Sequence, residues 1–191
     1  MKTILSFLLL ITLSINSVFS QDIITVGNTE LEVREVITGL DVPWEMKWGP
    51  DGFLWITERD GLVSRINVDT GEKNVILDIT NQVWQSSEAG LLGMEIHPDF
   101  NNGSPYVFLV YTYLSSGQKE KVVYYEYDAN SDQLINETIL LGNIPANPTH
   151  AGSRLLILDD LTMLVTTGDV QDWMDSQNLD VLSGKTLRMS I

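Results

Sequence analysis

The 191-residue sequence contains no cysteine and only two histidines, His97 and His150. Because cysteine is absent, disulfide scaffolds, thiolate zinc sites and cysteine nucleophiles are excluded. Basic residues are also few: 11 Lys and Arg stand against 26 Asp and Glu, which gives a formal net charge of −15. This balance argues against binding to nucleic acid, since neutralising phosphates requires clustered Lys and Arg. It argues equally against electrostatic binding to anionic membranes and favours a small neutral substrate or a cation.

A long apolar segment is present only at the N-terminus. The positively charged segment Met1–Lys2 precedes an apolar run from Ile4 to Ile15, and small residues then lead to Ser20. The pattern predicts a secretory signal that is cleaved after Ser20. The run is shorter than the ~20 residues needed to span a bilayer. We therefore expect residues 1–20 to be a signal peptide, and residues 21–191 to be secreted or periplasmic with no membrane span.

The rest of the chain repeats one pattern, in which a turn rich in Pro, Asp, Asn and Gly leads into a short β-branched and aromatic strand. Helical periodicity is hard to find, and only residues 172–182 suggest a helical turn or two. Several strands per ~50-residue unit are typical of a β-propeller, with a β-sandwich as the alternative. The predicted strands are Phe53–Thr57, Leu62–Val68, Tyr106–Tyr111, Val122–Tyr127, Arg154–Leu158, Met163–Thr167 and Thr186–Ile191.

The number of such units is small. At roughly 45–60 residues per blade, residues 21–191 provide about three blades. Propellers close with about 4–8 blades, and an open set of three would expose a sheet edge. We therefore predict an all-β chain that forms the N-terminal, incomplete part of a β-propeller domain.

His150 is the most suggestive single residue, because it lies in a loop that enters a predicted strand. A neutral imidazole near pH 7 can take a proton from an alcohol. Asp169 ends the next predicted strand, so the two residues fall at the same end of a hairpin. A carboxylate there could hold the imidazole in its useful tautomer. A histidine that caps a loop, with Asp169 as a turn residue, explains the same spacing, and both interpretations stay open.

Other conspicuous residues have simpler structural interpretations. His97 lies in a His-Pro-Asp-Phe sequence that is typical of a turn. Trp44 and Trp48 flank the start of an inner strand, and we expect both to be packing residues. Gly90 and Gly93 permit close backbone approach, which fits a tight entry into a strand.

Several motifs follow one another along the chain: Leu40–Trp44, Gly49–Gly52, Gly90–Gly93, His97–Phe100, His150–Leu155, Thr167–Asp169 and Gln177–Arg188. In this order they resemble the soluble quinoprotein glucose dehydrogenases, and still more the related aldose sugar dehydrogenases. The resemblance covers nearly all of residues 38–191. That family folds as a six-bladed β-propeller, so the resemblance implies that this chain holds about the first three blades.

The resemblance also implies a chemistry. The cofactor would be pyrroloquinoline quinone, held by calcium, and an aldose would be oxidised at C1 to the lactone before electrons pass to an acceptor. His150 would be the base that takes the hydroxyl proton while hydride passes to the quinone, and Asp169 would orient it. The family's later cofactor ligands and its calcium-binding carbonyls would lie beyond Ile191, and metal ligands within this chain are unknown.

Glu88 departs from the family pattern. It occupies a position where the glucose dehydrogenases have a glutamine that contacts the cofactor, so it is the candidate cofactor-binding residue of this chain. A carboxylate beside an anionic quinone is repulsive unless it is protonated or paired.

A non-catalytic function is the alternative. The resemblance extends to the hedgehog-interacting proteins, in which a related propeller serves binding. Glu88 and the acidic composition favour an extracellular module of that kind, which would bind a protein or a glycan. Propeller hydrolases such as lactonases need a metal-binding carboxylate cluster, which the sequence does not identify.

Overall fold

The computed structural model describes residues 21–191, so the predicted signal peptide lies outside the described residues. The chain divides after Val36 into two units. In the first unit, β1 (Gln21–Val26) and β2 (Thr29–Arg34) form an antiparallel hairpin. Among residues 21–191, no helix is both long and apolar enough to cross a membrane.

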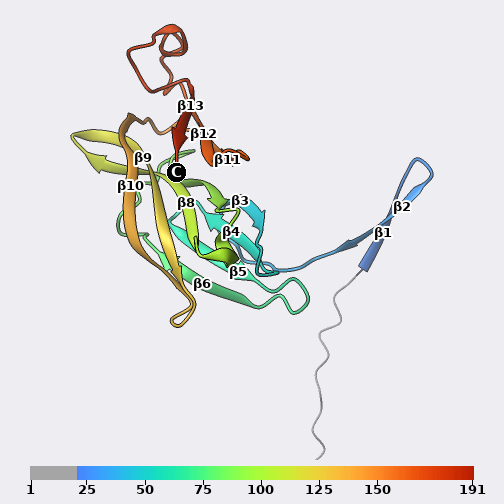
Figure 1. Ribbon diagram of the computed structural model, residues 1–191. Coiled ribbons are helices and arrows are strands. Elements are labelled where there is room, and N and C mark those ends of the chain that lie inside the picture. Colours follow the sequence, from blue (N-terminus) through green and yellow to red (C-terminus); the bar gives the residue numbers. More distant parts are fainter. Residues whose placement is uncertain (1–20) are drawn as a thin grey trace, which may run out of the picture. The chain divides into compact units, whose positions relative to one another are not determined.

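The second unit, Ile37–Ile191, contains three antiparallel sheets in chain order (Figure 1). The first sheet has the order β3 (Pro43–Trp48), β4 (Leu54–Glu58), β5 (Leu62–Ile66) and β6 (Lys73–Asp78). The second has the order β7 (Leu91–Ile96), β8 (Tyr106–Ser115), β9 (Gly117–Asp128) and β10 (Gln133–Pro145). The third consists of β11 (Ser153–Ile157), β12 (Thr162–Thr167) and β13 (Thr186–Ser190).

The first strands of the three sheets lie next to one another. β3 contacts β7, and β7 contacts β11, while each sheet continues outward from its first strand. This is the arrangement of consecutive propeller blades, in which each four-stranded meander presents its first strand to a central axis. The prediction of an all-β chain with about three blades of a β-propeller is confirmed.

The core lies between the sheets and explains why β8 is continuously apolar from Val107 to Tyr111. Val107, Leu109 and Tyr111 face the first sheet, whereas Phe108 and Val110 face the third. Successive side chains of a strand point to opposite faces, so a strand buried on both sides reads as a continuous apolar run. Trp55 and Val63 complete the first cluster from the first sheet, and Leu155, Met163 and Val165 complete the second from the third sheet.

All seven predicted strands are present, with ends that differ by a few residues. The hairpin β1–β2 and the strands β3, β6, β7 and β10 were not among the predicted ranges. β10 carries polar residues and three register shifts, so its side chains do not alternate regularly. In the segment 172–182, helical structure is confined to one 3-10 turn, Asp175–Gln177.

The expectation that Trp48 is a packing residue is wrong. The Trp48 side chain is 63% exposed, whereas Trp44 is half-buried. The alternation of β3 explains the exposure of Trp48, because Glu45 and Lys47 occupy the face that pairs with the neighbouring sheets. Glu45 binds Arg154 of β11, and Lys47 binds Glu95 of β7 at 2.8 Å. The tryptophans therefore point to the other face.

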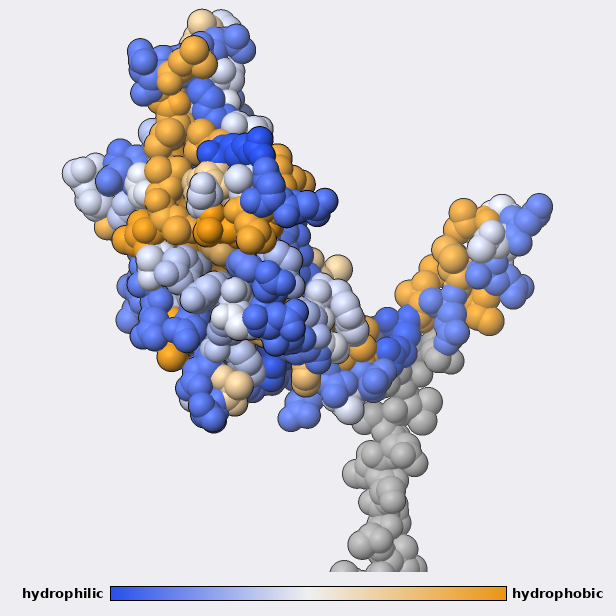
Figure 2. Space-filling view, viewed as in Figure 1, coloured by the Kyte–Doolittle hydropathy of each residue, from blue (hydrophilic) through white to orange (hydrophobic). Residues whose placement is uncertain are grey.

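Apolar side chains also remain exposed on the third sheet and on the loop between β12 and β13. Figure 2 shows them as a continuous apolar area around these segments. The exposed residues there include Leu156, Trp173, Met174 and Leu179.

Candidate active site

Three loops meet at one end of the second and third sheets. They are the loop before β7, which carries Glu88, the loop between β10 and β11, which carries His150, and the loop after β12, which carries Asp169. Hydrogen bonds connect them: the Glu88 amide donates to the Pro148 carbonyl at 2.8 Å, and the Val170 amide donates to the His150 carbonyl at 3.3 Å. The structure thus brings together all three residues that the sequence analysis selected.

His150 and Asp169 form a hydrogen-bonded pair. The Nδ1 atom of His150 lies 2.7 Å from Oδ1 of Asp169. The hydrogen bond from the imidazole, followed by that from the Gln171 amide, holds the pKa of the Asp169 carboxyl below its usual range. The carboxylate is therefore ionised at neutral pH and selects the tautomer with hydrogen on Nδ1. Within residues 21–191, Nε2 makes no hydrogen bond, and the His150 side chain is 55% exposed.

The backbone of His150 is fixed in an unusual conformation. Its φ of 58° lies in the left-handed region, which a residue with a side chain rarely adopts. Gly168 makes this possible on one side, because a Cβ atom there would lie 1.6 Å from the His150 carbonyl oxygen. The Gly184 amide donates to the Gly168 carbonyl at 2.7 Å and holds this segment in place. Gly168 was not among the predicted site residues, although its position directly before Asp169 was a signal.

Glu88 binds the loop of His150 rather than standing free. Its Oε2 atom accepts a hydrogen bond of 2.6 Å from the main-chain amide of His150. The turn that carries Glu88 is itself held by the Arg59 guanidinium, which donates to the Ser87 carbonyl. Gly90 passes so close to Arg59 that a Cβ atom would lie 2.3 Å from the Arg59 carbonyl oxygen, which confirms the predicted close approach.

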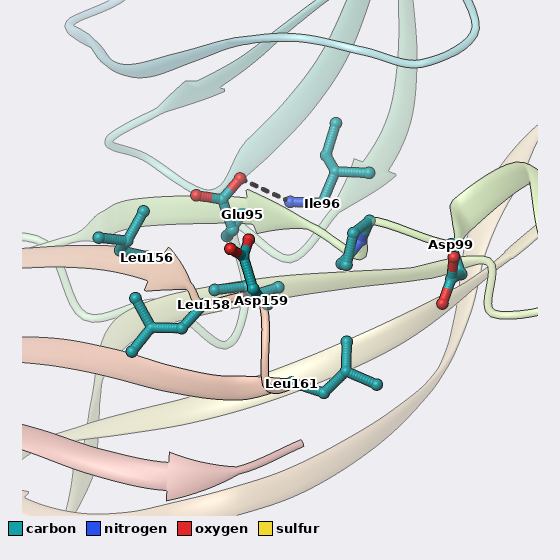
Figure 3. A pocket seen from close by; sticks show the side chains of 9 residues that line it. Glu95, Ile96, Asp99, Leu156, Leu158, Asp159 and Leu161 are labelled. Atoms are coloured by element: carbon teal, nitrogen blue, oxygen red, sulfur yellow. Dashed lines mark hydrogen bonds between the residues drawn. The ribbon is translucent and has the colours of Figure 1, made fainter.

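A separate cavity of about 570 Å³ lies at the opposite ends of β7 and β11 (Figure 3). His97 lies in the adjacent turn, where it is buried and its Nδ1 accepts the Asp99 amide at 3.0 Å. His97 is thus far along the strand from the candidate site, in the turn that its sequence predicted. The cavity is lined by Glu95, Ile96, Pro98, Asp99, Leu156, Ile157, Leu158, Asp159 and Leu161.

No group of three or more His, Asp or Glu side chains within the described residues is placed to hold a metal ion. The expectation of a bound calcium ion therefore rests on the family resemblance of the sequence. The geometry provides an exposed imidazole whose distal nitrogen is free and whose proximal nitrogen is held by a carboxylate. Such a pair can accept a proton from a hydroxyl group.

Comparison with known proteins identifies the family. Residues 40–191 match the sequence profile described as Glucose / Sorbosone dehydrogenase. The chain belongs to this family. Quinoprotein glucose dehydrogenase B of Acinetobacter calcoaceticus is 30% identical over 145 residues, which are 71% of this chain and 30% of that protein.

Solved structures agree with the family assignment. A putative oxidoreductase (glucose dehydrogenase) from Thermus thermophilus has a TM-score of 0.73 and 33% identity, over 82% of this chain and 46% of that one. The PQQ-bound aldose sugar dehydrogenase of Streptomyces coelicolor has a TM-score of 0.76 and 28% identity, over 92% and 49%. The chain thus spans less than half the length of each of these two solved chains.

The polar groups of His150, Asp169 and Glu88 indicate how a quinone would fit at this site. His150 has a free Nε2 on an exposed ring, and its Nδ1 is held by an ionised carboxylate, so the pair suits proton transfer beside a quinone. Glu88 directs one carboxylate oxygen to the His150 amide, so part of its charge is compensated within the protein. The pair is therefore compatible with a quinone of the kind bound in the Streptomyces coelicolor structure.

Proposed function

We propose that the whole protein is a secreted or periplasmic quinoprotein dehydrogenase that oxidises an aldose at C1 to the lactone. The observation that carries this proposal is the 2.7 Å contact between His150 Nδ1 and Asp169, on an imidazole whose Nε2 is free among the described residues. Membership of the glucose/sorbosone dehydrogenase family supports the substrate class. The PQQ-bound relative supports the cofactor.

The proton has a defined path in this proposal. The C1 hydroxyl of the sugar donates a hydrogen bond to Nε2 of His150, and Nε2 takes the proton as the C1–H bond breaks. Asp169 accepts a hydrogen bond from Nδ1 and stabilises the imidazolium that results. Pyrroloquinoline quinone, when bound, supplies a two-electron acceptor for the hydride equivalent from C1.

Calcium and an external electron acceptor complete the proposal. Calcium would hold the anionic cofactor, since this ion prefers oxygen ligands. The acceptor would reoxidise the reduced cofactor and allow a second turnover. His150 and Asp169 are the residues that this chain contributes next to the reacting carbon.

The test is dye reduction by the full-length protein with pyrroloquinoline quinone, calcium and a set of aldoses. Wild-type protein should reduce the dye, and His150→Ala should lose activity by about 10²- to 10⁴-fold. Binding of the quinone, followed by its absorbance, should persist in His150→Ala and serve as the control. Activity that survives the substitution would remove His150 from the mechanism. Wild-type protein that binds no quinone, with or without calcium, would favour a non-catalytic binding module.

A further inference from the structure

Glu88 belongs to a short, well-fixed turn. The Ser86 amide donates to the Ala89 carbonyl at 3.1 Å, and the Ala89 amide donates back at 2.9 Å. The Arg59 guanidinium donates to the carbonyl of Ser87, between these residues. The Glu88 amide donates to Pro148, two residues before His150. The turn is therefore held in place and is hydrogen-bonded to the loop that carries the imidazole.

The main-chain polar groups of His150 are both bound, each by a different loop. Its amide donates to Oε2 of Glu88 at 2.6 Å, and its carbonyl accepts the Val170 amide at 3.3 Å. A hydrogen bond to an ionised acceptor is roughly twice as strong as one between neutral groups. Glu88 thus makes the stronger of the two backbone attachments.

The hydrogen bond from the His150 amide to Glu88 matters because the backbone of His150 is left-handed. Such a conformation is unfavourable for a residue with a side chain and persists only where the surrounding structure holds it. Without the bond to Glu88, the φ of 58° would be supported mainly by Val170 and by the close contact with Gly168. Relaxation of the backbone would turn the Cα–Cβ bond and carry the imidazole away from its present position.

We propose that Glu88 is a positioning residue that holds the imidazole of His150 through the main-chain amide of His150. This replaces a direct role in cofactor binding for Glu88, and it rests on the proposed function for its catalytic consequence. A glutamine at position 88 could make the same hydrogen bond through its amide oxygen. An alanine could not.

Hydrogen exchange of the His150 amide tests the attachment in the cofactor-free, full-length protein. Glu88→Ala should increase the exchange rate by about 10- to 100-fold, as expected when a hydrogen bond to a charged group is lost. Glu88→Gln should keep most of the protection. Gln85→Ala, an exposed position in the same loop, is the matched control and should leave exchange unchanged. Equal exchange in wild-type and Glu88→Ala protein would overturn the proposal.

Kinetics of the quinone-loaded protein test the consequence. Glu88→Ala should lower kcat by about 10- to 100-fold at saturating quinone, since small displacements of a catalytic group cost this much. The affinity for quinone should stay unchanged, and Glu88→Gln should restore most of kcat. A loss of quinone affinity with kcat preserved at saturation would instead make Glu88 a cofactor contact. If wild-type protein oxidises no aldose, the proposed function fails, and the exchange experiment still decides whether Glu88 holds His150.

Discussion

His150 has a strained backbone, an anchored amide and a paired imidazole nitrogen. Its φ of 58° is combined with hydrogen bonds to Glu88 and Asp169. Strained residues that the surrounding structure holds in place cluster at functional sites. The pair with Asp169 could be predicted from the sequence, because the hairpin of β11 and β12 places both residues at one end. The bond to Glu88 could not, since it joins residues that are 62 positions apart.

Asp169→Asn should lower activity while leaving the fold intact. The imidazole hydrogen bond is the main cause that holds the pKa of Asp169 below its usual range, so the carboxylate stays charged at neutral pH. An asparagine is neutral and can present its NH₂ group to Nδ1, which would favour the wrong tautomer. We expect kcat to fall by about 10²- to 10⁴-fold. Steady-state dye reduction measures it, and an unchanged kcat would show that Asp169 is a turn residue only.

Gly168→Ala should displace His150 directly. A Cβ atom at this position would lie 1.6 Å from the His150 carbonyl oxygen, so the backbone must move. We expect kcat to fall by about 100-fold or more. Gly152→Ala is the matched control, because a Cβ atom there meets nothing within 4 Å. Equal activity of the two variants would contradict a requirement for the close contact between Gly168 and His150.

At the scale of the elements, the strands differ in how clearly the sequence indicated them. β8 is rich in aromatic and β-branched residues, β12 in β-branched ones and β11 in leucine and isoleucine, and their positions were predicted well. β10 is longer, and bulges interrupt its alternation near Asn136 and Asn143, both of which have positive φ. Regular periodicity is the signal that sequence reasoning uses, so a bulged strand escapes it.

β9 contains a buried ionisable side chain that periodicity alone would not place in the core. Glu120 lies opposite Thr112 of β8 and Ile144 of β10, on the face that carries Val122 toward the third sheet. Its side chain is buried, and within the described chain its Oε1 atom has no hydrogen-bond partner. Burial raises the pKa of Glu120 to about 8.

Glu120 should therefore make the stability of the protein depend on pH. Between pH 4.5 and about 8, the unfolded chain loses this proton while the folded chain keeps it, so the free energy of unfolding falls as pH rises. The full contribution is present below pH 4.5 and is lost above about pH 8. The size of the raised pKa corresponds to about 3–5 kcal/mol.

Glu120→Gln should remove this dependence, because its neutral amide replaces the protonated carboxyl. Urea unfolding of the full-length protein at pH 5 and pH 8 measures the free energy of unfolding of the variant and of the wild type. Relative to the wild type, the variant should be more stable at pH 8 than at pH 5. Glu126→Gln, at an exposed position of the same strand, is the control and should follow the wild type. Parallel pH profiles for Glu120→Gln and wild type would show that Glu120 is ionised in the folded protein.

At the scale of the second unit, the contacts that join the sheets link residues far apart in the sequence. Arg65 of β5 binds Asp132 in the turn between β9 and β10 at 2.8 Å. Thr57 of β4 donates to the Leu92 carbonyl of β7 at 2.9 Å and accepts the Glu45 amide at 3.0 Å. The repeat length predicted about three blades, but these contacts depend on how the blades pack. Single-sequence periodicity does not report that packing.

Thr57→Val should weaken the attachment between the first two sheets with almost no change in side-chain volume. Valine fills the space of threonine but lacks the hydroxyl, so the Leu92 carbonyl and the Glu45 amide each lose a partner in the interior. Leaving buried polar groups without partners costs about 1–3 kcal/mol for each group, so we expect a loss of about 2–4 kcal/mol in the free energy of unfolding. Thr57→Ser keeps the hydroxyl and should retain most of the stability. Urea unfolding of the full-length protein measures both variants, and a valine variant as stable as the wild type would show that the hydroxyl bridge does not join the blades.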